Sequence, residues 1–562
     1  MLRTPKIMRF CRTILLLFIA FNALKITLFN GSIVPLSSAG LFATKFITTF
    51  LALLIFFPLL LVSRSRLLLL FLCLLQTVYI ITTISYFLCS HGFLQLIQWG
   101  SLFQEAIISA GHAATPQNIR LLTAVIDVPL LICFYIKYPV IKRTLPLCHP
   151  AHIALVFCSL FVLCAMEASH YLRGNSLVHH LENSSGSMDE SAIVLRYGTL
   201  VNSLVNLSFY RNEHDLISSL KYGPEQLMGV PAPRRRPNFV FIQIESMDSA
   251  IIAAKYKDVH IAPFLHSLIG HSVYYPYSFS YHIGGGTSDS EFSIINSVEP
   301  LSNFPAIKLT SYDYPNSMLK RLTAASYRTM AFHGNRGKFY DRDRAFPRMG
   351  FAEFHDLEKM AIAESGWGAP DHEVFDYALT RMQEQIHPFF SFIITMSSHT
   401  PYKAVASYFS NRRFDDIDDK TTRHYFNSIS YVDDSLRMFI AEIRRTLPNT
   451  YIFIQGDHDA SLANRLYSGA TDSIDGNYLE YVPLFIITPD NQIHTEHQSV
   501  ASFLDIAPTV LTAAGINCAI RTDGQDLLRP ESVTSLIPYK KRAYRRDYLY
   551  SRIAEKSGRL HQ

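Results

Sequence analysis

Two carboxylates and a histidine directly follow apolar, strand-like runs and form a candidate metal site. Glu245 follows the run 239–244, and Gly456-Asp457-His458 follows the run 451–455. A carboxylate at the end of a buried strand needs a cation or several hydrogen-bond donors to stay ionised. Two hard oxygen ligands and one imidazole suit Mn²⁺, Mg²⁺ or Zn²⁺. Taken singly, each residue also fits a plain turn or a packed histidine, so the prediction depends on their use together.

A glycine-rich stretch supplies a candidate nucleophile, Thr287, within Gly284-Gly285-Gly286-Thr287-Ser288-Asp289-Ser290-Glu291. The glycines permit close backbone approach, and Ser288 with Glu291 fits a capping box that starts a helix. Thr287 would then lie at a helix N-terminus, which favours an alkoxide and an incoming phosphate. The alternative is a glycine-rich turn with a threonine cap. A metal that lowers the pKa of the hydroxyl favours the nucleophile.

The elements that must position these residues are strands of an α/β sheet. Apolar runs alternate with helical patterns, as in strands that are buried on both faces of a parallel sheet. The runs are 239–244, 327–332, 389–395, 451–455 and 482–487. We predict a doubly wound α/β architecture. Polar residues follow four of the runs, and ligands bind at the carboxyl ends of such strands, so Glu245, His333, His399 and Asp457 converge on one site.

The first third of the chain is apolar enough for a membrane anchor. Hydrophobic residues make up 49% of the 562 residues and charged residues 17%. Five apolar runs reach or approach the length of a bilayer crossing. They lie at about 12–29, 40–62, 67–88, 119–136 and 151–167. The Lys and Arg residues between them place the N-terminus inside and everything after residue 168 outside the cytoplasm. We therefore expect a multi-pass protein of the plasma (inner) membrane with an extracytoplasmic catalytic domain.

The predicted domain division follows from these runs and from a Pro- and Arg-rich stretch that ends at 237. It gives a transmembrane anchor (1–167), a juxtamembrane linker (168–237), a catalytic domain (238–535) and a basic C-terminal tail (536–562). Asp127 lies within the fourth apolar run, where a charged residue is either functional or a hydrogen-bonded structural carboxyl. We favour the structural interpretation.

Charge and cysteine content exclude other classes. The net charge of +5 is small for this length and forms no basic face, so we expect no nucleic-acid partner. Of the eight cysteines, only Cys518 lies in the polar part of the chain. The catalytic domain therefore needs no disulfide framework.

Motifs in order along residues 190–520 resemble the lipoteichoic acid synthase family, which comprises phosphoglycerol transferases of the sulfatase and alkaline-phosphatase superfamily. The motifs are NFVFIQIESM at 238–247, GGGTSDSEF at 284–292, HGNRGKFYDR at 333–342, SSHTPY at 397–402, GDH at 456–458 and FLDIAPTVLTAAGI at 503–516. Sulfatases mature a Cys or Ser in a C/S-x-P-x-R motif, which the nucleophile stretch lacks, so hydrolysis of sulfate esters is disfavoured.

The resemblance implies roles for individual residues. It implies that Thr287 is the nucleophile, and that Glu245, Thr287, Asp457 and His458 bind one divalent metal, Mn²⁺ in the family. It also implies that His333, Arg342 and His399 line the pocket for phosphate and glycerol. Tyr340 is a departure, because the family commonly has tryptophan two residues before the arginine. Tyrosine keeps the apolar wall of the pocket but adds a hydroxyl, which bears on the identity of the headgroup rather than on the reaction class.

The expected reaction is a two-step displacement on phosphatidylglycerol. Thr287 attacks phosphorus, diacylglycerol leaves, and an acceptor hydroxyl takes the glycerophosphate from threonine. His399 either transfers a proton or only donates a hydrogen bond. The acceptor is a polyglycerophosphate, a glycolipid, another glycan or water. Phosphoethanolamine transfer and phosphodiester hydrolysis are alternatives on the same site. A membrane receptor or scaffold with a decayed site is the alternative from another class.

Overall fold

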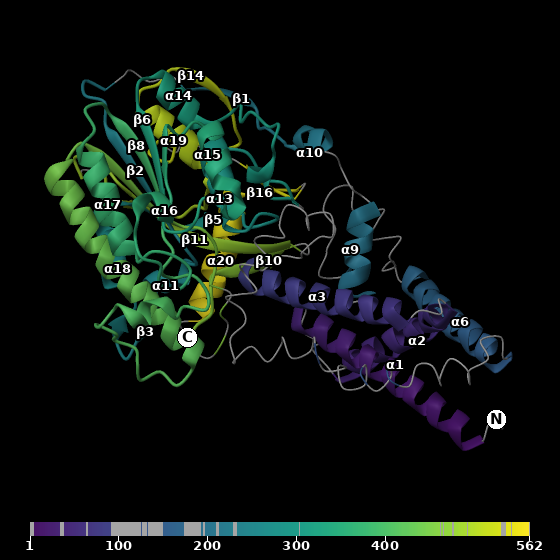
Figure 1. The fold of residues 1–562 in the computed structure, drawn as a ribbon. Coiled ribbons are helices and arrows are strands. Elements are labelled where there is room, and N and C mark those ends of the chain that lie inside the picture. The colour runs from purple at the N-terminus through teal and green to yellow at the C-terminus, as the bar shows by residue number, and fades with distance from the viewer. Residues whose placement is uncertain are drawn as a thin grey trace. The chain divides into compact units, whose positions relative to one another are not determined.

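A computed structural model divides the chain into two compact units, Met1–Tyr210 and Arg211–Gln562 (Figure 1). The structure describes residues 5–33, 39–62, 66–90, 125, 132, 136, 150–172, 193–194, 197–208, 213–228 and 233–560, the last range with gaps at 303, 461, 463, 465, 475–476, 492, 530–535 and 541.

The first unit is helical. Its named helices are α1 (Pro5–Ile33), α2 (Ala39–Val62), α3 (Arg66–Ser90), α6 (Pro150–Leu172) and α9 (Thr199–Ser208). Four of the five predicted apolar runs thus lie in helices, whereas the run 119–136, with Asp127, lies largely outside the described residues. Within the described part of the chain, no helix combines the length and the hydropathy that a bilayer crossing requires.

The second unit contains a ten-stranded mixed sheet whose central strands are parallel. The main order is β12-β5-β11-β9-β2-β8-β6-β7, with β10 paired to β11 and β13 paired to β5. Their bounds are β2 Asn238–Ile244, β5 Val273–Phe279, β6 Arg328–His333, β7 Glu353–His355, β8 Phe389–Ile394, β9 Thr450–Gly456, β10 Thr471–Ile474, β11 Asn477–Ile487, β12 Thr495–Glu496 and β13 Ala501–Ser502. Strands β9, β2, β8, β6 and β7 run parallel, and the sequence predicts the first four of them.

The expectation of a purely parallel sheet is wrong at 482–487. This run belongs to β11, which pairs antiparallel with both β9 and β5. A continuous apolar run indicates burial on both faces but not strand direction, because side chains alternate between the faces in both kinds of sheet.

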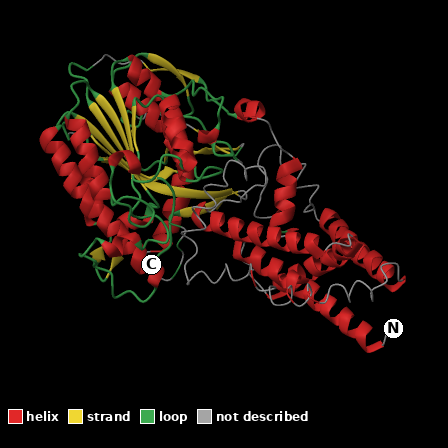
Figure 2. Cartoon of the chain, viewed as in Figure 1, coloured by secondary structure: helices red, strands yellow, loops and turns green. Residues whose placement is uncertain are grey.

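Helices cover both faces of the sheet (Figure 2). One core joins alternate strand residues such as Phe239 and Phe241 to α13 (Thr287–Asn296), α14 (Met318–Ala324), α15 (Arg342–Met349), α19 (Ile506–Ala513) and α20 (Arg546–Leu560). The other core joins Val240 and Ile242 to α11 (Ala250–Ala253), α12 (Pro263–Ser267), α16 (Leu357–Met360), α17 (Asp371–Gln383) and α18 (Lys420–Thr446). Adjacent residues of β2 therefore belong to opposite cores, which confirms an α/β domain with helices on both faces of its sheet.

The segments that flank the predicted catalytic domain are also part of the second unit. Before it, α10 (Glu213–Ser219) leads to β1 (Glu225–Met228), which pairs with β14 (Cys518–Arg521). After it, β15 (Leu536–Tyr539) and β16 (Arg542–Arg545) form a hairpin that precedes α20. Leu549 and Ile553 of α20 are buried in the first core. The unit is therefore larger at both ends than the range 238–535.

Candidate active site

The carboxyl ends of β2 and β9 bring the predicted metal ligands together. The two strands are parallel neighbours in which Ile244 pairs with Gly456, so Glu245 and Asp457 leave the sheet at the same level. His458 Nε2 lies 3.3 Å from Glu245 Oε1 and 3.7 Å from Asp457 Oδ2. One ligand atom from each of the three buried residues lies within 4.8 Å of the other two. The structure thus gathers two carboxylates and one imidazole at a single point.

The hydrogen bonds of Asp457 leave one oxygen for a cation. Oδ1 accepts the backbone N–H groups of Ser246 (2.8 Å) and His458 (2.7 Å). Oδ2 is buried and accepts no hydrogen bond from the described residues. A buried carboxylate oxygen without a donor is costly, and a divalent cation would remove that cost. The donor set therefore fits the predicted metal.

Electrostatics at this cluster also favour a cation. Burial would raise the pKa of Glu245, but the charges of His399 and His458 hold it below its usual range. Burial and the Glu245 charge raise the pKa of Asp457 well above its usual value. Burial lowers the pKa of His458, but Asp457 and Glu245 together raise it well above normal. The cluster therefore retains protons that a bound cation would displace.

His458 is oriented by contacts on the side away from Glu245. Its Nδ1 lies 2.7 Å from the carbonyl oxygen of Asp459, which leaves Nε2 directed at the carboxylates. The His282 ring stacks on the His458 ring with centroids 4.2 Å apart. Glu480 of β11 contacts His282 Nδ1 at 3.2 Å and accepts the backbone N–H of Asp459 at 3.0 Å. Burial opposes ionisation of Glu480, but the His282 charge and hydrogen bond lower its pKa to about 2.

Thr287 is the first residue of α13 and faces the same cluster. Its Oγ1 donates to Glu245 Oε2 at 3.5 Å, a long hydrogen bond. Gly286 precedes it at φ 56° and ψ −138°, a conformation essentially restricted to glycine. Asp289 accepts the backbone N–H groups of Ile283 and Gly285, which fixes the loop before the helix. The structure thus places the predicted nucleophile within reach of a predicted metal ligand.

The expected capping box between Ser288 and Glu291 is wrong. Helix α13 begins at Thr287, two residues earlier than the motif requires, so Ser288 lies inside the first turn and its Oγ donates to Gly285 O at 2.7 Å. Glu291 is instead fully buried and receives hydrogen bonds from Arg342 Nε and Nη2. The S-x-x-E spacing therefore does not mark a helix cap here, because its glutamate forms an ion pair with Arg342 instead.

Arg342 and Tyr340 lie together beside the nucleophile helix. Arg342 is 1% exposed and forms a charge pair with Glu291 at 2.5 Å, while Nη1 donates to Phe339 O at 3.1 Å. Its guanidinium carries five N–H groups, so donors remain for a substrate. Tyr340 has φ 58° and is buried, with its ring centroid 5.5 Å from the guanidinium carbon. The tyrosine therefore forms an apolar wall against the arginine.

His333 is the last residue of β6, and His399 lies in the loop after β8. Both ring nitrogens of His333 are buried and have no hydrogen-bond partner among the described residues. Burial and the Arg342 charge lower the pKa of His333 well below its usual value, so the ring is neutral. A neutral imidazole offers one donor and one acceptor, which suits a hydroxyl-bearing ligand. His399 is half-buried, and its Nδ1 lies 2.7 Å from Thr400 O, which directs Nε2 outward.

Reasoning from the sequence missed several residues around this site. Trp367 contacts His399 with ring centroids 4.5 Å apart and a tilt of 35° between the rings. Asp371 of α17 accepts the backbone N–H groups of Met396 and Ser397, and burial raises its pKa to about 7. His282 and Glu480 were missed as well. None of them follows a predicted strand in a recognised motif, and only the Gly-Trp-Gly context of Trp367 could have drawn attention to it.

Comparison with known proteins assigns the second unit to a family. The sulfatase family model matches residues 237–516. The chain is 26% identical over 343 residues to the lipoteichoic acid synthase-like YvgJ of Bacillus subtilis, covering 58% of this chain and 55% of that protein. It is also 26% identical over 363 residues to the lipoteichoic acid synthase of Staphylococcus saprophyticus, covering 60% and 55%. The chain spans about half the length of the curated relatives it matches.

Solved structures show the same fold. The lipoteichoic acid synthase LtaP from Listeria monocytogenes aligns with a TM-score of 0.50 at 23% identity, over 59% of this chain and 83% of that one. The integral membrane protein lipooligosaccharide phosphoethanolamine transferase A (EptA) from Neisseria meningitidis aligns with a TM-score of 0.55 at 14% identity, over 90% and 96%. The chain therefore belongs to the sulfatase and alkaline-phosphatase superfamily, in which the lipoteichoic acid synthase family is the branch that its sequence matches.

Proposed function

We propose that this chain is a membrane-bound, metal-dependent phosphotransferase that moves glycerophosphate from phosphatidylglycerol to an extracytoplasmic acceptor through Thr287. The observation that carries the proposal is the approach of Thr287 Oγ1 to Glu245 beside the buried Asp457 and His458. A hydroxyl next to this donor set is the arrangement that nucleophilic catalysis requires. The matched lipoteichoic acid synthases support the reaction class.

In the first step, Thr287 Oγ1 attacks the lipid phosphorus and diacylglycerol leaves. Glu245, Asp457 and His458 would hold the metal together with Thr287, and that cation would lower the pKa of the hydroxyl and offset phosphate charge. Gly286 and Asp289 fix the start of α13, so the hydroxyl is oriented before the substrate binds. The product of this step is a glycerophosphate ester on Thr287.

The pocket beside α13 would bind the headgroup. Arg342 is oriented by Glu291 and would donate its remaining N–H groups to phosphate oxygens. The neutral ring of His333 has both nitrogens available for a glycerol hydroxyl. Tyr340 would cover the apolar side of the ligand. Because Tyr340 also carries a hydroxyl, phosphoethanolamine is the alternative headgroup.

In the second step, an acceptor hydroxyl displaces Thr287 from phosphorus. His399 would donate a proton to the leaving oxygen in the first step and accept one from the acceptor in the second, through Nε2. The acceptor is a polyglycerophosphate, a glycolipid or another glycan, and water in its absence.

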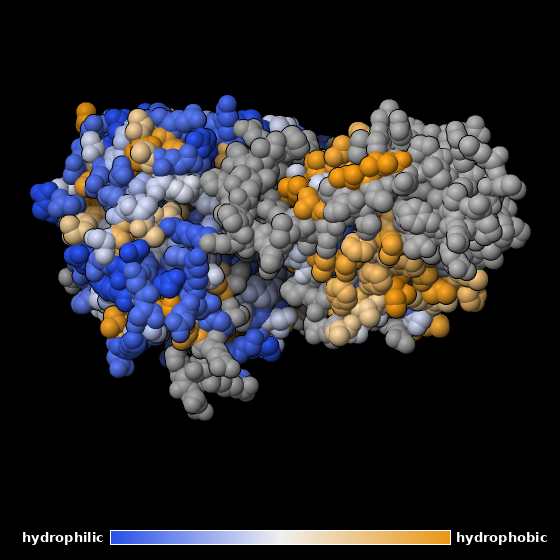
Figure 3. Space-filling view, turned by 60° about the horizontal axis from the view of Figure 1, so that its bottom comes forward, coloured by the Kyte–Doolittle hydropathy of each residue, from blue (hydrophilic) through white to orange (hydrophobic). Residues whose placement is uncertain are grey.

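The first unit would anchor this site near its lipid donor. Large apolar side chains on its helices are exposed, including Phe71 and Leu74 of α3 and Phe157 and Phe161 of α6. Figure 3 shows that hydrophobic residues dominate the visible described surface of these helices, whereas that of the second unit is mainly hydrophilic. A large exposed apolar surface indicates contact with lipid or with another protein. We propose the plasma (inner) membrane, with the second unit outside the cytoplasm.

A labelled donor tests the proposal. Native membranes that contain the protein are incubated with phosphatidylglycerol labelled in its headgroup glycerol. We expect diacylglycerol release together with transfer of the label to Thr287, detected by mass spectrometry of the peptide around 284–292. Label that appears only with phosphatidylethanolamine would assign the headgroup to ethanolamine. Release without any adduct at Thr287 would exclude the threonine ester.

A further inference from the structure

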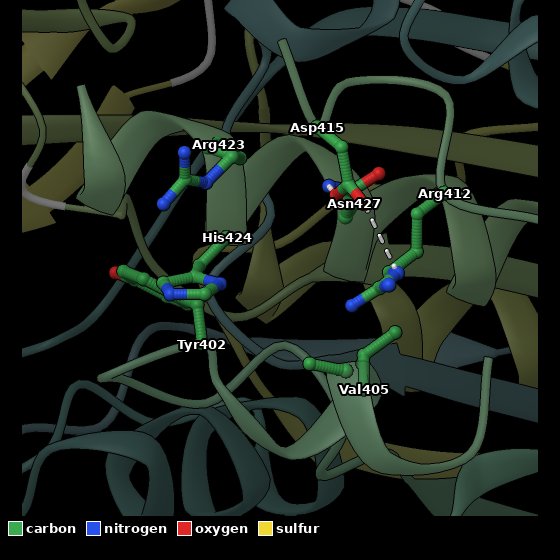
Figure 4. Close-up of a pocket in the computed structure, with 8 residues that line it drawn as sticks. Tyr402, Val405, Arg412, Asp415, Arg423, His424 and Asn427 are labelled. Atoms are coloured by element: carbon green, nitrogen blue, oxygen red, sulfur yellow. Dashed lines mark hydrogen bonds and ion pairs between the residues drawn. The ribbon is translucent and has the colours of Figure 1, made fainter. Parts of the chain in front are cut away.

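A second polar cavity lies beside the catalytic loops, outside the site described above. Its volume is 310 Å³, and two arginines, a histidine and an asparagine contribute polar groups to it (Figure 4). The lining also includes one acid, Asp415, and apolar contributions from Tyr402, Val405 and Ala406. This volume is at the lower end of the range for small-molecule sites. The cavity is therefore large enough for a small polar ligand.

The cavity shares its walls with the catalytic loops. Tyr402, three residues after His399, donates its hydroxyl to Ala460 O at 2.8 Å, two residues after His458. On α18, Tyr425 points inward and donates to Ser246 O at 2.9 Å, next to Glu245. Its neighbours Arg423 and His424 line the cavity. One turn of α18 thus contacts a predicted metal loop and the cavity at once.

The charges that line the cavity favour an anion. Arg412 and Arg423 lie on opposite sides of the cavity (Figure 4), and Arg412 lies 3.3 Å from the carboxylate of Asp415. Arg423 donates from Nη1 to Ile417 O at 3.2 Å, which leaves most of its guanidinium N–H groups for a ligand. Two guanidinium groups therefore face a single carboxylate, so the lining carries excess positive charge.

Three other acids lie close to Asp415 in sequence but outside the cavity lining, and two of them have identified partners. Asp416 pairs with Lys257, and Asp419 accepts the backbone N–H of Thr422 at the start of α18. Burial, together with the charges of Arg423, Lys403 and Lys420, lowers the pKa of His424, while Asp415 opposes this shift only weakly. At the His424 ring, the nearby cations therefore outweigh Asp415.

We propose that this cavity binds the phosphate group of a phosphate ester, held between Arg423 and Arg412. Planar guanidinium groups match the oxygens of phosphate in a two-pronged contact, and Asn427 adds an amide donor. The role of such a ligand in transfer rests on the proposed function. In that reaction, the cavity holds a phosphate of an anionic acceptor whose free hydroxyl reaches the glycerophosphate on Thr287.

The proposal is tested by binding of sn-glycerol 1-phosphate to the full-length protein in detergent, measured by titration calorimetry. EDTA is present, so that a metal-dependent site does not contribute. Arg423→Gln is compared with Arg437→Gln, which removes the same charge from an exposed position on the same helix. We expect the Kd of Arg423→Gln to rise at least tenfold, and that of Arg437→Gln to equal the wild-type value. Equal Kd values for the two variants with every phosphate ester tested, or no binding of any of these esters by the wild type, would overturn the proposal.

Two further experiments control for a loss of the fold and identify the ligand. Arg412→Gln repeats the test at an exposed side chain. If Arg423→Gln has a lower unfolding temperature than Arg437→Gln, the Kd of Arg412→Gln decides whether the cavity binds phosphate. Short-chain phosphatidylglycerol replaces glycerol phosphate in a parallel titration. If only the binding of the lipid depends on Arg423, the cavity binds a lipid headgroup. If the binding of the free ester depends on Arg423, the cavity binds a water-soluble acceptor.

Diacylglycerol release by the wild-type protein is measured in the same preparations without EDTA and with Mn²⁺ added. Arg423-dependent binding without any release would retain the cavity and remove the proposed function. Release without Arg423-dependent binding would retain the proposed function and exclude the phosphate site in the cavity. Each proposal can therefore be excluded without excluding the other.

Discussion

Thr287 is half-buried, while the three groups behind it are almost completely shielded from solvent. A ligand can therefore approach the hydroxyl from outside while the carboxylates remain in a dry environment. Such an environment strengthens their interaction with a cation. The chemistry expected at this residue depends on this contrast in exposure.

We expect Thr287→Ala to abolish diacylglycerol release and Thr287→Ser to retain part of it. The serine variant keeps a hydroxyl at the first position of α13, whereas alanine removes the nucleophile. Release from phosphatidylglycerol measures the effect, and the unfolding temperature checks that the fold is intact. Unchanged release by Thr287→Ala would exclude this residue as the nucleophile.

Ser288→Ala is the matched control for this experiment. Ser288 Oγ is buried and donates to Gly285 O, so its loss should cost about 1 kcal/mol of stability. Transfer activity at a temperature well below unfolding should remain. Loss of release in Ser288→Ala alone, with Thr287→Ala active, would mean that the nucleophile is one residue further along the chain.

Removal of one ligand charge should empty the predicted metal site. We expect Asp457→Asn to lower metal affinity by more than the factor of about 10–100 that is typical of groups that only orient ligands. Asparagine can still accept backbone N–H groups through one oxygen, so the variant should fold. Elemental analysis of the purified protein measures the effect, and the exposed Asp418→Asn is the control. Equal metal content in the two variants would remove Asp457 from the site.

At the scale of elements, α18 connects the cavity, the catalytic loops and α12. Asp433 of α18 accepts the backbone N–H groups of Phe264 (2.9 Å) and Leu265 (2.8 Å) at the start of α12. Burial raises the pKa of Asp433 to about 6 in the folded protein, against its ordinary value of 3.8. This carboxyl therefore binds its proton more tightly when the protein is folded.

This pKa shift of Asp433 makes the free energy of unfolding depend on pH in a direction that can be stated. A raised folded-state pKa contributes stability that is fully present below about pH 4 and is lost as the pH rises through about 6. The span of about two pKa units corresponds to about 3 kcal/mol at most. We expect the stability advantage of the wild type over Asp433→Asn to shrink between pH 4 and pH 7. Unfolding temperatures across this range measure it, and a constant difference would contradict the raised pKa.

The sequence predicts some elements better than others for identifiable reasons. The parallel strands β2, β6, β8 and β9 are continuous apolar runs with polar ends, so both their burial and the residues that follow them can be recognised. Strand β11 contributes Glu480 from its partly polar first half and runs antiparallel, so neither its direction nor its residue at the site follows from the pattern. The ion pair of Glu291 could not be predicted either, because its partner Arg342 is 51 residues away in the sequence.

At the scale of the whole molecule, the C-terminal helix contributes to the stability of the second unit. Arg546, the first residue of α20, is almost fully buried and donates to both oxygens of Asp505, which lies just before α19. Asp505 also closes a capping box with Ser502. Residues 536–560 therefore complete a buried ion pair as well as a hydrophobic core.

We expect a fragment of residues 211–562 to be more soluble and more stable than one of residues 211–535. The shorter fragment exposes the core that Leu549 and Ile553 cover, and it leaves the Asp505 charge buried without its partner. Breaking a buried pair in this way costs about 3–5 kcal/mol. Chromatographic behaviour and unfolding temperature compare the fragments. Equal stability of the two would show that α20 is dispensable for folding.

The contact between Trp367 and His399 gives the molecule a built-in optical probe. The chain has only two tryptophans, and Trp99 is the other. The substitution Trp99→Phe would leave all indole emission to a ring whose centroid lies 4.5 Å from that of His399. A protonated imidazole quenches indole fluorescence, so the emission would follow the charge of His399. Occupancy of the site by a lipid or an acceptor could then be followed in real time without a label.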